Sequence, residues 1–335
     1  MICFVGELLM PFLFHKSLLL LLLSGFLLFS SVAWAETEVL YGKGLFWKIE
    51  KDDRAPSYLL GTMHVADPRV LKMKDEVKPY LTKAKILYKE VEQTHREYRE
   101  QTNMRIRDDD RTLDQDLSEE QFKKVVEVAK SIDLEEEDLK VLELWFVYEL
   151  LKGAPWYRGT DNDKDSREDD EPVLDTQLGI MAFESNVKVQ GLEKARERAQ
   201  LVWGRPAPIY LKGIERALEN VDIIKDAAKR REQFIQNYLN RDTTRMYHTL
   251  EETLKDEPPE IYEIEKIAML DKRNLNMVNG MTKGLIKGNS FTAVGALHLP
   301  GEEGILNILV NRGYTVSRMD CGEDEKSSFC PNQDM

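Results

Sequence analysis

The chain has 335 residues, of which 32% are charged, and its formal net charge is −13 at pH 7. An acidic chain without a basic tract is poorly suited to nucleic acid or to an anionic membrane surface, so the composition argues against both as partners. The length suits one large domain, or one domain that carries a long insertion.

The first 35 residues have the pattern of a secretory signal peptide. Lys16 precedes an apolar stretch over residues 17–30, and Ala33-Trp34-Ala35 forms a small-x-small cleavage site. We therefore predict cleavage after Ala35, a mature chain of residues 36–335 without a membrane span, and a periplasmic or secreted location. The alternative is a retained N-terminal anchor, although the apolar stretch is short for a span.

Two cysteines remain in the predicted mature chain, Cys321 and Cys330. In an oxidising compartment we expect them to form a structural disulfide. The loop that it closes is short, so the chain-entropy model gives it about 2–3 kcal/mol. The alternative is a cysteine-based metal site, for which nothing nearby supplies further ligands.

The N-terminal third of the mature chain is predicted to begin a sheet. Its elements, in chain order, are strands at 44–50 and 57–62, an amphipathic helix at 73–84 and a strand at 86–92. The first two strands form a hairpin. The strand–helix–strand order that follows is a crossover unit, which brings His64 and Glu90 to neighbouring strand ends.

From about residue 97 to residue 285 the periodicity is almost entirely helical, and only residues 187–191 resemble a strand. We interpret this region as a helical insertion that covers the sheet. Residues 289–318 then return to strand, glycine turn, helix and strand. The predicted fold is α/β, with a central sheet built from the N-terminal and C-terminal segments around a large helical insertion.

The same Gly-x-x-His motif ends two of the predicted strands, at Gly61 to His64 and at Gly295 to His298. The carboxyl end of a strand is where open α/β sheets bind their ligands. A glycine lets the chain turn sharply and lets a ligand approach the backbone. The repeated motif therefore indicates a shared ligand site.

His64, Glu90 and His298 together form a candidate metal site. Two imidazoles and one carboxylate are a common set at catalytic metals, and they leave positions open for water and substrate. Such an ion lowers the pKa of bound water and polarises a carbonyl. Glu92, two residues beyond Glu90 on the same strand face, is the candidate proton acceptor, with Glu90 itself as the alternative. The structural alternative is that each histidine is simply hydrogen-bonded at its strand end.

Several segments of the chain resemble the TraB/PrgY/GumN family, which includes the animal Tiki proteases that act on Wnt. They follow in the same order over about residues 40–320: SYLLGTMHVADPRV, ILYKEVE, VLDTQL, VQGLEKARERAQ, DKRNLNM and FTAVGALHLPGEEGILNILVNRGYTVSRM. The resemblance implies an α/β fold and a metal-dependent hydrolase. The implied activity is that of a metalloprotease with a peptide or protein substrate, using manganese, cobalt or zinc.

The resemblance also implies residue roles. The two motif histidines of the family fall on His64 and His298, and its strand carboxylate falls on Glu90. The family usually has Asp where this chain has Glu92, so the chain departs from the pattern by one methylene.

Further positions emphasised by the family pattern are Asp175, Glu193, Arg273 and Asn274. Arg273 is a candidate to anchor a substrate carboxylate or to stabilise an oxyanion, because its planar fork suits either. Asp175 is a candidate to orient a ligand histidine. The alternative roles of these residues are helix caps and structural ion pairs.

Three functions follow as hypotheses. The first is an exported metal-dependent hydrolase of peptide or amide bonds. The second is a metal-independent hydrolase in which a histidine or carboxylate acts as general base on water. The third is a non-catalytic protein that binds a peptide or another ligand, for which an acidic cleft would suit a basic peptide.

Overall fold

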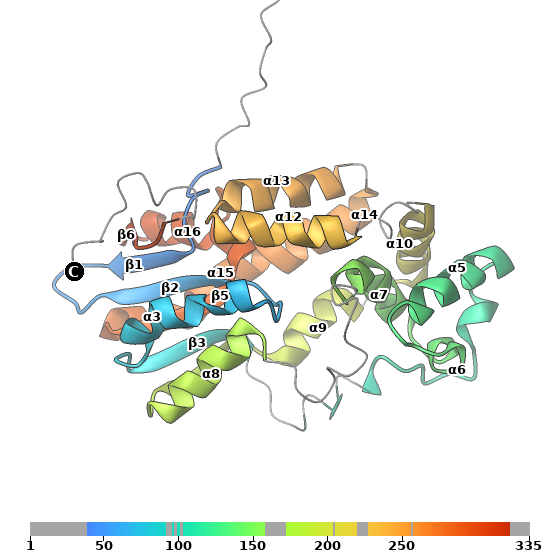
Figure 1. Cartoon of the computed structure of the whole chain (residues 1–335), viewed down its shortest axis with the longest axis horizontal. Coiled ribbons are helices and arrows are strands. Elements are labelled where there is room, and N and C mark those ends of the chain that lie inside the picture. The colour runs from blue at the N-terminus through green and yellow to red at the C-terminus, as the bar shows by residue number, and fades with distance from the viewer. Residues whose placement is uncertain are drawn as a thin grey trace, which may run out of the picture. The chain divides into compact units, whose positions relative to one another are not determined.

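The structure, a computed structural model, describes residues 39–91, 96, 99–100, 103–157, 172–203, 205–219, 227–255 and 257–321. Within these residues the chain is built around a mixed sheet with helices on both faces (Figure 1). The strands are β1 (Phe46–Glu50), β2 (Ser57–Thr62), β3 (Ile86–Val91), β4 (Lys188–Glu193), β5 (Ser290–Gly295) and β6 (Thr315–Arg318). Their order across the sheet is β4-β3-β5-β2-β1-β6.

The pairing of the strands brings the carboxyl ends of four of them to one edge of the sheet. β1 and β2 form the predicted antiparallel hairpin, and β6 pairs with the other side of β1. β2, β5, β3 and β4 are mutually parallel, with Thr62 opposite Gly295 and Val91 opposite Glu193. The carboxyl ends of these four strands therefore meet at the same edge of the sheet.

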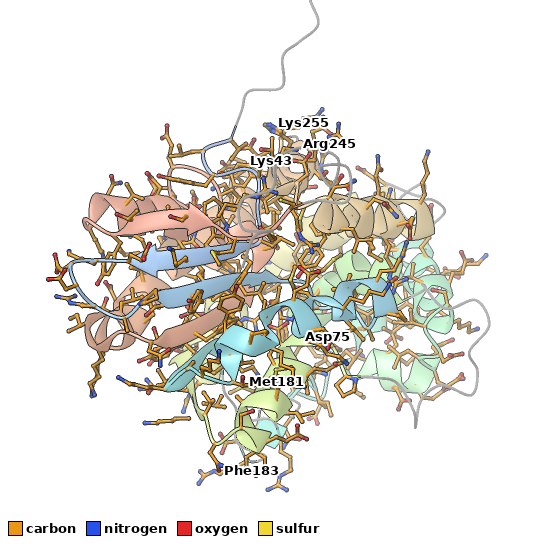
Figure 2. All side chains as sticks on the ribbon, turned by 60° about the vertical axis from the view of Figure 1, so that its left-hand side comes forward. Lys43, Asp75, Met181, Phe183, Arg245 and Lys255 are labelled. Atoms are coloured by element: carbon orange, nitrogen blue, oxygen red, sulfur yellow. The ribbon has the colours of Figure 1, made fainter. Side chains whose placement is uncertain are left out.

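Alternation along the strands divides the apolar side chains between two faces. Leu60 packs on one face and Leu59 on the other, and both are almost fully buried. Each such side chain contributes about 1.5–3 kcal/mol by its burial. The first face is covered by α2 (Pro68–Leu71), α3 (Met73–Leu81), α8 (Leu174–Glu184) and α12 (Ala227–Leu239). The second is covered by α15 (Lys272–Lys287) and α16 (Ile305–Asn311). On α8 the outer side remains open, where Phe183 points away from the sheet (Figure 2).

Helices between β3 and β5 form a separate apolar core. They are η2 (Leu113–Gln115), α5 (Glu119–Lys130), α6 (Glu136–Lys140), α7 (Leu144–Tyr157), α10 (Ala207–Glu219) and α14 (Pro259–Tyr262). Sequence signals fix some of their ends: Ser118 is the N-cap of α5, and its side chain accepts a hydrogen bond from the backbone N–H of Gln121 in a capping box. The remaining helices are α9 (Ala195–Trp203), α13 (Thr243–Leu254), the π-helix η3 (Glu263–Asp271) and η4 (Ala296–His298).

The predicted α/β fold is confirmed, including a large helical region between the N-terminal and C-terminal strands. One detail differs: β4, from the helical region, joins the central sheet as an edge strand. Across the described ranges, no helix is both long and apolar enough to cross a membrane. The predicted signal peptide lies outside those ranges, and so does Cys330, so cleavage and the disulfide with Cys321 stay predictions.

Candidate functional site

Four neighbouring strands bring titratable side chains to their shared carboxyl edge. Following the order β4-β3-β5-β2, these are Glu193, Glu90, His298 and His64. His64 lies two residues beyond β2, and His298 ends the short turn η4 that follows β5. The predicted crossover geometry thus brings both Gly-x-x-His motifs to one edge of the sheet.

Glu90 is buried, and each of its two carboxylate oxygens accepts a hydrogen bond. The backbone N–H of Gly295 donates to Oε1 at 2.6 Å, and Arg273 Nη2 donates to Oε2 at 2.6 Å. Burial alone would raise the pKa of Glu90, but the interactions with His298, Arg273 and the Gly295 N–H outweigh it and hold this pKa well below its usual range. Glu90 is therefore an ionised carboxylate and a poor proton acceptor at neutral pH.

The two motif glycines permit close approach of other groups. A Cβ on Gly295 would lie 3.1 Å from Glu90 Oε1, and one on Gly61 would lie 3.0 Å from Ala296 Cα in η4. Neither glycine has a positive φ. A turn with positive φ is therefore not the reason for glycine at these two positions. The groups that come close to them are protein atoms, and the approach of a ligand stays a prediction.

His298 is buried and held in one orientation. Its Nδ1 lies 2.6 Å from Asn274 Oδ1, and Asn274 Nδ2 donates to the Glu303 carbonyl at 2.7 Å. Because the amide nitrogen of Asn274 is used in this way, we assign the ring proton to Nδ1, which leaves Nε2 as an acceptor. Burial lowers the pKa of His298 to about 4, so the ring is neutral at physiological pH.

Arg273 connects three of the site's side chains. Its Nε donates to Glu193 Oε2 at 2.8 Å, its Nη2 to Glu90, and its Nη1 lies 3.3 Å from His298 Nε2. Nη1 also donates to the Met269 carbonyl at 3.1 Å in η3. The guanidinium is buried and bound to two protein carboxylates, so anchoring a substrate carboxylate by Arg273 would require breaking one of these pairs.

His64 has a different environment, because its side chain is 59% exposed. Its Nδ1 lies 3.1 Å from Asp175 Oδ2, and Thr62 Oγ1 donates to the other oxygen of Asp175 at 2.9 Å. Asp175 raises the pKa of His64, against the lowering effect of burial. Asp175 therefore lies beside His64, and its role in orienting this ring stays a prediction.

The donor set fits a divalent cation in its chemistry. Both histidines have Nδ1 beside a side-chain oxygen, as metal-binding histidines do, and Glu90 adds a carboxylate whose Oε1 is 3.6 Å from His298 Nε2. Among the side chains that the structure describes, no three of His, Cys, Asp or Glu are grouped closely enough to hold an ion. The three-ligand set remains a prediction, and Glu92 lies outside the described residues.

Sequence reasoning missed one residue near this edge, Arg198 on α9. Its side chain is exposed, and its positive charge lowers the pKa of His64, Glu90, Glu193 and His298. The available signal was its place in the VQGLEKARERAQ segment, little more than one helical turn after Glu193.

The fold and this edge define a class: an α/β protein whose parallel strands carry two histidines and two glutamates to a common carboxyl end, the usual ligand-binding position of such sheets. The chain belongs to the TraB/PrgY/gumN family, whose model matches residues 45–318. The match runs from the residue before β1 to the end of β6 and includes all of the site residues described above, which confirms the family resemblance. No curated protein matched the chain.

Proposed function

We propose that the protein is an exported metal-dependent hydrolase that cleaves peptide or amide bonds, with His64, Glu90 and His298 as metal ligands. One observation carries the proposal: the histidines that follow two adjacent strands, β2 and β5, each have Nδ1 beside a side-chain oxygen, which leaves the two Nε2 atoms as the candidate metal ligands. Nε2 of His298 also lies 3.3 Å from Arg273 Nη1. When bound, the ion would supply an activated water and polarise the substrate carbonyl.

The protein's own groups have complementary roles in this proposal. Asn274 keeps His298 in one tautomer, and the Gly295 N–H and Arg273 keep Glu90 ionised. Arg273 also adds fixed positive charge close to the position where an oxyanion would form. Glu92 is the proposed proton acceptor. Glu193 is a further candidate, because it lies at the same edge and burial raises its pKa above the ordinary value.

A metal-independent hydrolase is the second candidate, and the His64–Asp175 pair favours it. An exposed imidazole whose Nδ1 faces a buried carboxylate is the arrangement of a general base that activates water. The contact of Arg273 with both Glu90 and His298 also supports this candidate, because the guanidinium already supplies positive charge there.

The test is a peptide-library screen of the purified mature chain after chelation, with Mn²⁺, Co²⁺ or Zn²⁺ added back separately. We expect ion-dependent cleavage that falls at least about a hundredfold in His64→Ala and in His298→Ala. Because the His64 side chain is mostly exposed, its removal leaves the core intact. His248→Ala is the matched control, since His248 pairs with Glu251 on its own helix.

Equal turnover by wild type and His298→Ala would exclude the site from catalysis. Cleavage that resists chelation but is lost in Asp175→Asn would select the metal-independent candidate. Tight peptide binding without cleavage over long incubation would instead indicate a binding protein.

A further inference from the structure

The path of the chain brings Arg198 to the edge of the sheet at which the parallel strands β4, β3, β5 and β2 end. β4 ends at Glu193, which binds Arg273, and α9 begins two residues later. The amide of Arg198 donates to the Lys194 carbonyl at 3.1 Å, so Arg198 lies in the first turn of this helix. α9 also packs on η3, the helix whose Met269 carbonyl accepts from Arg273. α9 is therefore joined to β4 and packed on η3, two of the elements whose groups bind Arg273.

The charge of Arg198 acts on four of the titratable groups along the edge. It lowers the pKa of His64, Glu90, Glu193 and His298, which come from four different strands. This effect agrees with the path of the chain, which places Arg198 in the first turn of the helix that follows the end of β4.

The two guanidiniums at the edge differ in what they bind. Arg273 is buried and paired with Glu90 and Glu193. Arg198 is exposed, and within the described part of the chain no carboxylate forms an ion pair with it. An arginine has a planar fork of N–H donors that matches a carboxylate in two parallel hydrogen bonds. Among the described residues, carboxylate partners are therefore present for the guanidinium of Arg273 and none for that of Arg198, whose side chain is exposed.

We propose that Arg198 is a specificity-determining residue, which binds a carboxylate of the substrate and places the neighbouring bond at the His64–Glu90–His298 edge. The cleavage part rests on the proposed function. The carboxylate comes either from the C-terminus of a peptide or from an acidic side chain. The preferred ligand is then an anionic peptide, in contrast to the basic peptide that the overall negative charge suggested.

The experiment measures binding, so it does not depend on turnover. Calorimetry on the mature chain compares N-acetyl-trialanine with its C-terminal amide. A second pair compares the amidated acetyl peptides Ala-Glu-Ala and Ala-Gln-Ala. The variants are Arg198→Ala and Arg198→Lys. Arg196→Ala is the matched control, because it removes the same charge from an exposed position on the same helix, about 200° away around the axis.

We expect wild type to bind the acid of at least one pair about tenfold or more tightly than its neutral partner, the effect of a charge-assisted hydrogen bond. Arg198→Ala should lose this preference, Arg198→Lys should retain part of it, and Arg196→Ala should keep it. The pair that responds identifies the source of the carboxylate.

Equal affinities within both pairs for wild type, absence of binding by all four peptides, or an unchanged preference in Arg198→Ala would overturn the inference. Retained carboxylate preference without any cleavage would overturn the proposed function and leave the assignment of Arg198 standing. Cleavage without carboxylate preference would overturn the assignment of Arg198 and leave the proposed function standing.

Discussion

His298 is enclosed by protein and bonded through Nδ1 to Asn274, whereas His64 is open to solvent and faces Asp175. Burial lowers the pKa of His298 to about 4, and Asp175 raises the pKa of His64. At the residue scale the two imidazoles therefore differ: that of His298 is neutral at physiological pH, and that of His64 has a pKa above its ordinary value.

The raised pKa of His64 gives a first prediction. Asp175→Asn removes the negative charge but keeps an oxygen for the Thr62 hydroxyl, so the pKa of His64 should fall toward its ordinary value of about 6.5. NMR titration of the imidazole measures it directly. Asp114→Asn, at an exposed position in η2, is the control and should leave the titration unchanged. A His64 pKa that stays the same in Asp175→Asn would contradict the pairing.

The lowered pKa of His298 predicts a pH dependence of stability. Between pH 6.5 and about pH 4, the imidazole of His298 is protonated in the unfolded chain but neutral in the folded chain. The free energy of unfolding therefore falls as the pH falls through this window. At about 1.4 kcal/mol for each pH unit, the contribution of this ring is about 3 kcal/mol.

Urea unfolding of wild type and His298→Gln at a series of pH values between 7 and 4 checks this prediction. The difference between the two proteins isolates the histidine from other titrating groups, and it should shrink or reverse as the pH falls. Parallel curves over the whole window would show that the ring is not buried in its neutral form.

At the element scale, the turn η4 places His298, and it packs directly on β2. Gly61 makes this contact possible, because a Cβ there would lie 2.8 Å from Leu299 Cδ1 and 3.0 Å from the Ala296 backbone. We predict that Gly61→Ala lowers the free energy of unfolding by about 1–3 kcal/mol, the usual cost of overpacking, and moves His298 relative to Glu90.

The matched control for Gly61→Ala is Gly179→Ala. Gly179 lies inside α8, where a new Cβ would meet only the flexible side chain of Lys89, at 3.4 Å. This change should stabilise the protein by about 0.5–1 kcal/mol, because alanine is the better helix residue. Denaturant unfolding measures both variants. Equal effects of the two substitutions would mean that η4 does not depend on the contact with β2.

Elements with strong local patterns could be predicted from the sequence. The hairpin of β1 and β2, the helix α3 and the unit from β5 to β6 all follow from alternation, amphipathic spacing and glycine turns. The side-chain partners could not be predicted in this way. Arg273 reaches Glu193 across 80 residues and Glu90 across 183, and no local pattern encodes such a pairing. The exposed Arg198 was missed for the same reason, since only the fold brings it to the edge.

At the scale of the whole molecule, the sheet and the helical region are joined by specific polar contacts as well as by apolar packing. Tyr238 on α12 is fully buried and donates its hydroxyl to the Gly61 carbonyl at 2.9 Å. Tyr238→Phe keeps the ring but leaves this carbonyl without that donor, so the free energy of unfolding should fall by about 1–2 kcal/mol. Tyr262→Phe, at an exposed ring, is the control for denaturant unfolding. No difference between the two variants would show that the contact adds no stability.

The central claim is that His64, Glu90 and His298, delivered by three strands, serve one divalent ion. Calorimetric titration of Mn²⁺ into the chelator-treated mature chain tests it most directly, with His64→Ala, Glu90→Gln and His298→Ala beside wild type and His248→Ala as the control. The account predicts one ion per chain, and affinity at least about tenfold weaker in each of the three variants but not in the control. Mn²⁺ affinity that is the same in wild type and in all three variants would contradict it.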